Sequence, residues 1–261
     1  MPSKFVPALL ACSLLPLSAA LAADPHPFDV RDLIAFERLS EPRVSPDGKA
    51  IVFTLSTLDL EANRRRTDLW LVGSDGGGMR QLTRDPNADT SGAWSPDGRS
   101  IYFLSTRSGS SQVWRLPLAG GEAQQVTTLP LDVGSFVLSP DGSSLAVALE
   151  VYPGNSPQET KQRLDAIAAG KATGRSYDRL FFRHWDTWAD GRRSHVFVLP
   201  LSGGEPVDVM KAMDADSPSK PFGGSDEYTF TPDGKSIVFT ARDVGREEAW
   251  STNFALFVVP I

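Results

Sequence analysis

The stretch Ser-Pro-Asp-Gly-Lys-Ala-Ile-Val-Phe at residues 45–53 decides the fold, because three related stretches follow it. They read SPDGRSIYF at 95–103, SPDGSSLAV at 139–147 and TPDGKSIVF at 231–239. Their prolines lie at positions 46, 96, 140 and 232, so the intervals are 50, 44 and 92 residues, and the last is twice 46. A fixed period of about 45 residues is typical of a β-propeller in which each repeat forms one blade.

The chemistry of the repeated stretch predicts a hairpin followed by a blade strand. Proline presets φ for the second position of a type I turn, aspartate tolerates the third, and glycine adopts the left-handed conformation that follows. Each repeat then carries a second apolar strand, which in the first three repeats is followed by a glycine turn and a short last strand, a four-strand pattern that is typical of a blade. The second strands are expected at 68–72, 112–118, 195–201 and 255–261. A β-sandwich whose turns agree by chance is the alternative, but it does not explain turns that repeat in phase.

The fourth repeat ends at Val259-Pro260-Ile261, before the turn and last strand that the other repeats contain. We therefore expect an all-β chain in which residues 44–261 form a partial, unclosed propeller of three blades and most of a fourth. An unclosed propeller exposes an edge strand and an uncovered blade face. The sequence predicts a fragment or truncated reading frame that is poorly stable or associates with itself.

Two segments interrupt the repeats. Residues 29–39 predict a short N-terminal helix, with Asp29 as the N-cap and with Leu33, Phe36 and Leu39 on one face. The second segment is an insertion at 152–193 within the third repeat. Its first part predicts a helix with Ser156 as N-cap, Pro157 at the first position, Glu159 completing a capping box and Gly170 at the stop. Its second part, 177–188, is rich in aromatic and charged residues.

The first 22 residues are typical of a secretory signal peptide. Lys4 provides the positive charge, an apolar stretch follows, and Ala20-Leu21-Ala22 fits a cleavage site, so the mature chain is expected to begin at Ala23. Residues 23–43 are then a lead into the propeller. We expect a periplasmic or secreted protein, with a lipoprotein anchored through Cys12 as the less favoured alternative.

Composition excludes several classes of protein. The chain has 26 basic and 32 acidic residues, a formal net charge of -6, which argues against nucleic-acid binding. One cysteine excludes a disulfide scaffold and any cysteine-based metal site. Residues 85–89 begin like a calcium loop, but Thr90 replaces the required glycine and Pro96 the bidentate glutamate. The three histidines, His26, His184 and His195, have no zinc-motif spacing. We expect no metal, no cofactor and no membrane span.

The signal peptide, the SPDG hairpins and the run YDRLFFRHWDTWADGRRSHVFV at 177–198 resemble the N-terminal propeller of bacterial prolyl oligopeptidase-family serine peptidases. The acylaminoacyl-peptidase and dipeptidyl-peptidase V branches are the most similar. The resemblance implies a C-terminal α/β-hydrolase domain with a Ser-Asp-His triad, and a propeller that admits short peptides and excludes folded proteins. The stretch 245–253 supports the same resemblance, whereas SPDG alone is shared with TolB-type propellers.

No catalytic residue is expected in this chain. A nucleophile elbow requires G-x-S-x-G between a strand and a helix. The nearest sequence is Gly142-Ser143-Ser144-Leu145-Ala146, and it lies in an SPDG hairpin. The chain alone is therefore expected to be inactive, although the parent protein is expected to be a serine-type exopeptidase or oligopeptidase. The alternative is a stand-alone, TolB-like periplasmic propeller that binds a protein or peptide.

Two groups of residues are candidates for a binding site. Adjacent carboxylates at Glu247 and Glu248 could bind a protonated peptide N-terminus through charge-assisted hydrogen bonds, as a glutamate pair does in dipeptidyl peptidase IV relatives. The alternative is a solvated loop between two strands. The second group lines a cavity between propeller and hydrolase, or else packs on its own blade with buried aromatic rings and a paired arginine and aspartate. Its members are Arg183, His184, Trp185 and Asp186. Residues 64–66, three arginines, are expected in an exposed turn.

Overall fold

The computed structural model describes residues 26–211 and 213–261, in two units that divide after Ala35. The signal peptide and Cys12 lie outside the described residues. In the first unit, helix α1 (Val30–Ala35) begins after Asp29, whose Oδ1 accepts the Arg31 N–H at 2.7 Å. The predicted N-terminal helix is thus confirmed, but its extension to Leu39 is wrong. Leu39 pairs with Leu55 in a sheet, because strand pairing there outweighs the local helical pattern.

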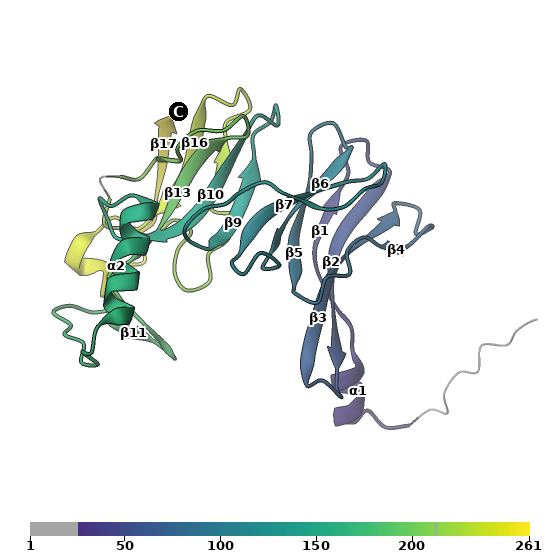
Figure 1. Ribbon diagram of the computed structural model, residues 1–261, viewed down its shortest axis with the longest axis horizontal. Helices are drawn as coiled ribbons and strands as arrows, with labels where there is room; N and C mark the ends of the chain where they lie inside the picture. The colour runs from purple at the N-terminus through teal and green to yellow at the C-terminus, as the bar shows by residue number, and fades with distance from the viewer. Residues whose placement is uncertain (1–25, 212) are drawn as a thin grey trace, which may run out of the picture. The chain divides into compact units, whose positions relative to one another are not determined.

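The second unit consists of blades, as the repeats predicted (Figure 1). Three sheets have four antiparallel strands and a fourth sheet has three. Blade 1 contains β1 (Arg38–Val44), β2 (Ala50–Asp59), β3 (Arg64–Gly73) and β4 (Arg80–Gln81). Blade 2 contains β5 (Asp89–Trp94), β6 (Ser100–Ser105), β7 (Gln112–Pro117) and β8 (Gln124–Gln125). Blade 3 contains β9 (Val133–Leu138), β10 (Ser144–Val151), β13 (Arg193–Pro200) and β14 (Val207–Asp208). Blade 4 contains β15 (Tyr228–Phe230), β16 (Ser236–Ala241) and β17 (Ala255–Pro260).

The SPDG hairpins have the predicted geometry and contact one another between blades. The four hairpin glycines have φ between 69° and 73°, the left-handed conformation in which a side chain is strained. In the third hairpin, Ser139 Oγ donates to Asp141 Oδ1 at 2.6 Å, and Asp141 accepts the Ser143 N–H at 3.0 Å. A Cβ on Gly142 would lie 3.2 Å from Pro96 Cδ of the preceding blade, so this glycine permits the close approach of two hairpins.

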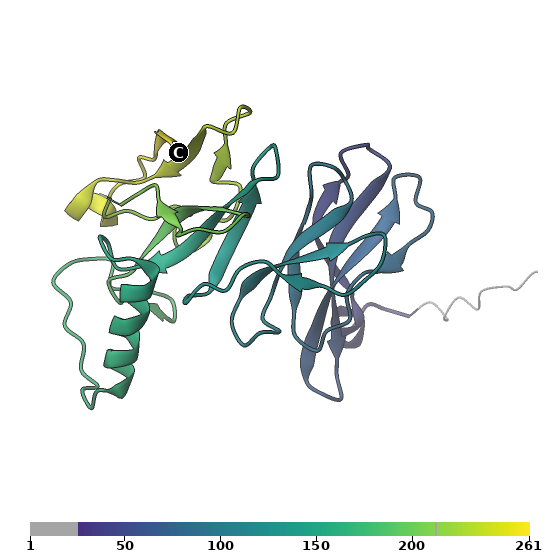
Figure 2. The same cartoon turned by 45° about the horizontal axis from the view of Figure 1, so that its top comes forward.

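Figure 2 shows the successive blades side by side. Three apolar cores lie between them, and alternate residues of one strand enter different cores. On β6, Ile101 and Phe103 pack with blade 1, whereas Tyr102 and Leu104 pack with blade 3. On β10, the larger Leu145, Val147 and Leu149 face blade 2, and the small Ala146 and Ala148 face blade 4. This two-residue alternation is what a strand buried on both faces requires. It explains why the strands read as nearly continuous apolar runs.

The insertion between β10 and β13 begins with helix α2 (Pro157–Ala169), which has the predicted capping box. Ser156 Oγ accepts the Glu159 N–H at 3.2 Å, and Glu159 Oε2 accepts the Ser156 N–H at 2.7 Å. A small hairpin of β11 (Arg183–His184) and β12 (Thr187–Trp188) follows. Between β16 and β17 lies a short 3-10 helix, η1 (Gly245–Ala249).

Two further features complete the fold. The three arginines at 64–66 begin β3 rather than forming a turn, because they pair with Thr57, Leu58 and Asp59 of β2. In blade 4, Leu256 and Val258 of β17 are 69% and 60% exposed, so one face of this blade is uncovered, as predicted. Within residues 26–211 and 213–261, the helices are too short or too polar to cross a membrane.

Candidate functional site

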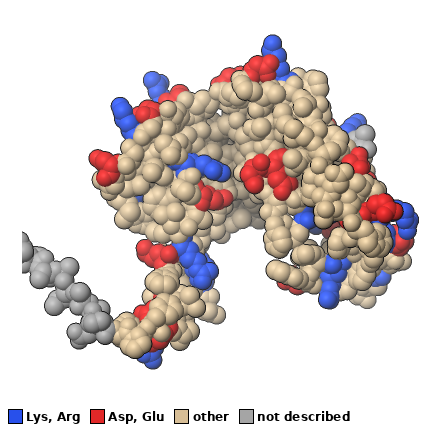
Figure 3. All heavy atoms as spheres, turned by 180° about the vertical axis from the view of Figure 1, so that it is seen from behind, with Lys and Arg blue, Asp and Glu red and all other residues tan. Residues whose placement is uncertain are grey.

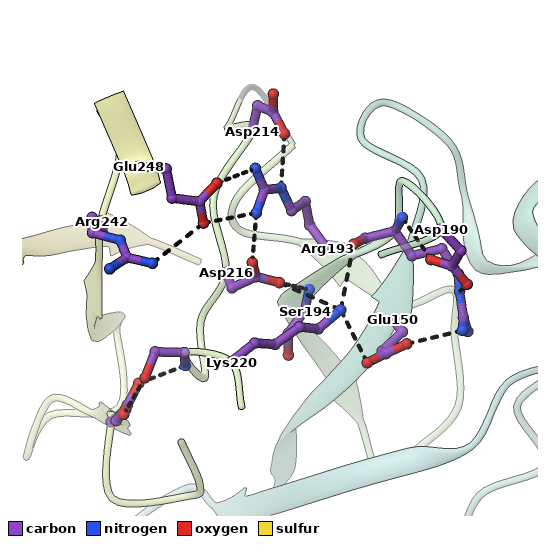
Figure 4. A network of polar contacts seen from close by, with 12 residues as sticks. Glu150, Asp190, Arg193, Ser194, Asp214, Asp216, Lys220, Arg242 and Glu248 are labelled. Carbon is purple, nitrogen blue, oxygen red and sulfur yellow. Dashed lines mark hydrogen bonds and ion pairs between the residues drawn. The ribbon is translucent and has the colours of Figure 1, made fainter. Parts of the chain in front are cut away.

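The two candidate glutamates lie side by side on η1 but in different environments. Glu248 is largely buried and accepts two hydrogen bonds from Arg193, from Nη1 at 3.0 Å and from Nη2 at 2.8 Å (Figure 4). Arg242 approaches the same carboxylate at 3.5 Å. Glu247 is exposed, and its carboxylate makes no ion pair with any residue that the structure describes. The pair therefore divides into one fixed and one free carboxylate.

Arg193, at the start of β13, is the centre of the surrounding network (Figure 4). Besides Glu248 it binds Asp214 at 2.8 Å and Asp216 at 2.8 Å. Burial acts to lower the pKa of Arg193, but its bonds to Glu248 and Asp214 and the charge of Asp216 raise that pKa well above the usual value. Burial likewise acts to raise the pKa of Asp214, yet bonds from Arg193 and Arg179 hold it below its ordinary value. Arg193 and Asp214 therefore stay charged at neutral pH.

The same network joins η1 to the insertion. Arg179 of the insertion pairs with Asp214 at 2.9 Å, and Arg246 of η1 donates to the backbone oxygen of Asp178 at 3.0 Å. Glu248 is joined to blade 3 through Arg193, as described above. Asp178 and Arg246, which are 68 positions apart in the sequence, are thus in direct contact. Residues 178 and 179 of the insertion are thus joined to η1 and to the ion-pair network of Arg193.

The four candidate residues of the insertion lie on the β11–β12 hairpin, and all are exposed. Trp185 is 76% exposed and has its ring 5.9 Å from that of Phe222, while His184 lies 5.5 Å from Trp185. Arg183 stacks over Trp188 at 5.2 Å, and no ion pair within the described residues joins it to Asp186. The alternative arrangement, with buried aromatic rings and a paired Arg183 and Asp186, is therefore not found among the described residues. Whether these side chains line a cavity to a second domain stays a prediction.

An open depression of the surface, about 420 Å³ in volume, lies next to this hairpin. Its lining residues are Tyr177, Asp178, Arg179, Leu180 and Phe182. The rings of Tyr177, Phe182 and Trp188 form a cluster with centroids 5.5 to 6.1 Å apart. The Tyr177 hydroxyl is buried, and no residue that the structure describes forms a hydrogen bond with it. This depression was not predicted from the sequence, although the aromatic run 177–188 was its visible signal.

The remaining residues singled out in the sequence have structural roles. Ser143 is part of a hairpin and donates to Asp141 at 2.8 Å, and the strand β10 follows it rather than a helix. His195 is fully buried, with Nδ1 at 2.9 Å from Asp208. Asp89 is buried against Arg107 at 2.6 Å, so this carboxylate of the calcium-like stretch is already neutralised.

Arg193, Asp214 and Asp216 were also not predicted from the sequence. No local pattern marks them, because Arg193 and Glu248 are 55 positions apart and meet only when blades 3 and 4 pack. On another face of the molecule, the charged side chains do not gather in one patch. Figure 3 shows one face on which basic and acidic side chains are scattered among uncharged ones.

Comparisons with known proteins agree with this architecture. Residues 35–163 match the family of the TolB beta propeller domain. Dipeptidyl-peptidase 5 of Porphyromonas gingivalis is 30% identical over 229 residues, which are 86% of this chain and 33% of that protein. Dipeptidyl-peptidase 5 of Porphyromonas endodontalis is 29% identical over 230 residues, 86% of this chain and 32% of that protein. The chain thus spans about a third of the length of these curated relatives.

The solved structures show the same fold. The acylaminoacyl peptidase of Pyrococcus horikoshii superposes with a TM-score of 0.59 at 16% identity, covering 87% of this chain and 31% of the other. At that identity the likeness concerns the fold and not the reaction.

Proposed function

We propose that this chain is the propeller portion of a serine peptidase. It carries a TolB-type β-propeller domain, and most of this chain's length is similar to dipeptidyl-peptidase 5. The resemblance to prolyl oligopeptidase-family propellers, expected from the hairpins and the 177–198 run, is confirmed. The catalytic α/β-hydrolase domain would follow the propeller, because the matched region is only about a third of each relative.

The substrate would be a short peptide with a free N-terminus. The observation that carries this proposal is the pair on η1, in which Glu248 is fixed by Arg193 and the exposed Glu247 carboxylate has no ion-pair partner among the described residues. A protonated amine beside Glu247 would gain a charge-assisted hydrogen bond, and the network would keep η1 in place while it binds. A propeller that surrounds such a site would admit short peptides and exclude folded proteins, which is the gating role that we propose.

The first experiment is to read the coding DNA beyond the codon for Ile261. An in-frame continuation that encodes G-x-S-x-G, an aspartate and a histidine in a hydrolase domain is the expected result. A stop codon with no hydrolase frame downstream would contradict the peptidase proposal. It would leave the alternative of a stand-alone TolB-like module, which binding assays against periplasmic proteins would then test.

The amine contact is tested in the full-length protein with Glu247→Gln. Losing a hydrogen bond to a charged group costs about 1.5–3 kcal/mol, so kcat/KM for peptides with a free N-terminus should fall about tenfold or more. The kcat/KM for N-acetylated peptides should not change. Asp243→Asn, which removes an exposed charge close to η1, is the matched control and should leave both substrates unchanged. An equal fall in kcat/KM in both variants would mean that the overall negative charge near η1, and not a contact with Glu247, is responsible.

Export is a separate proposal, since it concerns residues outside the described part. We propose cleavage after Ala22 and a periplasmic or secreted mature chain. N-terminal sequencing of the protein from a bacterial periplasmic extract should give Ala23 first. A lipid-labelled protein whose first residue is Cys12 would show the lipoprotein alternative instead.

A further inference from the structure

We propose that a hairpin arm of blade 1 binds an extended, acidic segment of another protein, which adds to the blade as a further strand. The arm consists of residues 56–67, the far end of the hairpin formed by β2 and β3 (Figure 1). It carries the three arginines at 64–66, which take no part in the ion-pair network of Arg193. The proposal does not depend on the peptidase assignment.

The arm exists because the ladder between β2 and β3 is unusually long. It has ten residue pairs, from Ala50 with Gly73 to Asp59 with Arg64, whereas β6 and β7 of blade 2 form six. Both ladders begin two residues after the glycine of the SPDG hairpin. The four additional pairs therefore extend the blade 1 hairpin by about 13 Å, at roughly 3.3 Å per residue.

The outer edge of β3 is open along this arm. Strand β4 pairs with residues 70–71, and the last backbone contact on that side is the bond from the Leu82 N–H to the Leu69 oxygen at 2.8 Å. Residues two positions apart direct their backbone groups to the same side of an antiparallel strand. Thr67 and Arg65 therefore direct their N–H and C=O groups outward, as Leu69 does. No described residue forms a hydrogen bond with these four groups, so a further strand can pair with them.

The side chains next to this open edge are basic. Arg64 and Arg66 share one face of the hairpin, Arg65 lies on the other, and all three are exposed. Arg66 pairs with Asp59 at 3.4 Å, and among the described residues neither of the other two arginines forms an ion pair. With Glu61 the arm has three basic and two acidic residues, a net charge of +1, in a chain whose net charge is -6.

These charges determine which strand the edge prefers. An incoming strand with glutamate at every second position places its carboxylates on one face, beside Arg64 and Arg66. Opposite charges on neighbouring strands stabilise a sheet, whereas like charges destabilise it. An anionic lipid would use the arginines but not the backbone groups of Arg65 and Thr67. The combination of a free edge and basic side chains thus favours an acidic polypeptide strand.

The arm also has its shape before a partner arrives. Asp59 Oδ1 accepts the Ala62 N–H at 3.0 Å, and the Asn63 N–H donates to the Leu60 oxygen at 3.3 Å, so the turn is closed by its own hydrogen bonds. An edge that is already formed loses little conformational freedom on binding, and this preorganisation favours affinity.

The test measures binding of two fluorescein-labelled peptides to the 261-residue chain by fluorescence anisotropy. They are Thr-Glu-Val-Glu-Val-Glu-Thr and Thr-Lys-Val-Lys-Val-Lys-Thr, with blocked termini so that no free amine can bind at Glu247. The acidic peptide should bind about tenfold or more tightly than the basic one, and the difference should shrink at about 0.5 M salt. Hydrogen exchange followed by mass spectrometry should show the bound acidic peptide slowing exchange in residues 60–69.

One pair of variants tests the charges. Arg64→Gln combined with Arg66→Gln should reduce the affinity for the acidic peptide about tenfold, to that for the basic one. Arg80→Gln combined with Arg84→Gln removes two exposed arginines in and after β4 of the same blade, and this matched control should keep the preference.

A second pair tests the backbone edge. Thr67→Pro removes an outward N–H and fills the edge with the proline ring, which an edge strand tolerates, so binding of the acidic peptide should fall about tenfold or more. Thr67→Val keeps the N–H and should bind as the unchanged chain does.

Four results would overturn the proposal. The first is equal affinity for the two peptides, and the second is tight binding of the acidic peptide that Thr67→Pro leaves intact. The third is binding of neither peptide, which would mean that the arginines only protect the edge against pairing. The fourth is self-association of the chain that Thr67→Pro abolishes, with neither peptide bound, which would assign the edge to a second copy of this chain.

Discussion

Arg193 is the side chain on which the candidate site depends, because three carboxylates share its guanidinium. Arg193→Met would leave Asp214, Asp216 and Glu248 close together without their cation. Removing one partner of a buried ion pair costs about 3–5 kcal/mol, and we expect a loss of that size in the free energy of unfolding, measured with urea. Arg179→Met is the control. It removes only an exposed pair with Asp214, so about 0–1 kcal/mol is expected. Equal losses in the free energy of unfolding would show that the ion pairs of Arg193 stabilise the fold no more than an exposed ion pair does.

Asp141 offers a prediction about pH. Hydrogen bonds from Ser139 and from the Ser143 N–H and hydroxyl lower its pKa to about 2 in the folded chain, whereas an unfolded aspartate titrates near 3.9. A lowered folded pKa means that the carboxylate stabilises the fold above about pH 4, and that this contribution disappears as the pH falls through about 2. A ¹³C-NMR titration of the Asp141 carboxyl carbon should have its midpoint near 2. A midpoint near 3.9 would contradict the hairpin hydrogen bonds.

Contacts between hairpins give a prediction about how neighbouring blades pack. Gly142 and Gly234 have φ of 70° and 69°, so alanine at either position is strained by about 1–2 kcal/mol. Only Gly142 lies against another hairpin, with Pro96 Cδ at 3.2 Å from a built Cβ, while no atom lies within 4 Å of the same position at Gly234. Gly142→Ala should therefore destabilise the chain by roughly 1 kcal/mol more than Gly234→Ala in urea unfolding. Equal losses in the free energy of unfolding would mean that the close approach of Gly142 to Pro96 does not contribute to stability.

Helix α2 gives a prediction about a single element. Its capping box joins Ser156 and Glu159 reciprocally, and replacing such a cap costs about 1 kcal/mol of helix stability. Ser156→Ala should speed amide hydrogen exchange at Glu159 and in the first turn about fivefold. The exposed Gln158→Ala change is the control and should have little effect. Unchanged exchange in Ser156→Ala would show that contacts with β10, not the cap, determine where the helix begins.

These elements also show which parts of the structure local sequence can predict. The hairpins and α2 were predictable because proline, glycine and capping residues act within a few positions. The extension of α1 to Leu39 and the turn at 64–66 were wrong, because pairing with β2 decides both. The glutamate pair was visible as a pair. Its division into a fixed Glu248 and a free Glu247 depends on Arg193, 55 positions away from Glu248, and no local rule reports that contact.

For the chain as a whole, the uncovered face of blade 4 has a measurable consequence. Each internal blade buries both faces between neighbours, but β17 leaves Leu256 and Val258 exposed and, among the described strands, pairs only with β16. An exposed apolar edge strand is a template for pairing with another chain. We expect the isolated 261-residue chain to associate with itself as its concentration rises, which sedimentation velocity measures. Leu256→Lys with Val258→Lys should reduce that association, because two charges would have to be buried. Val207→Lys, at an exposed apolar position on β14, is the control and should not. A monomer at all concentrations with one sharp thermal transition would show that this face is stable in water without a partner.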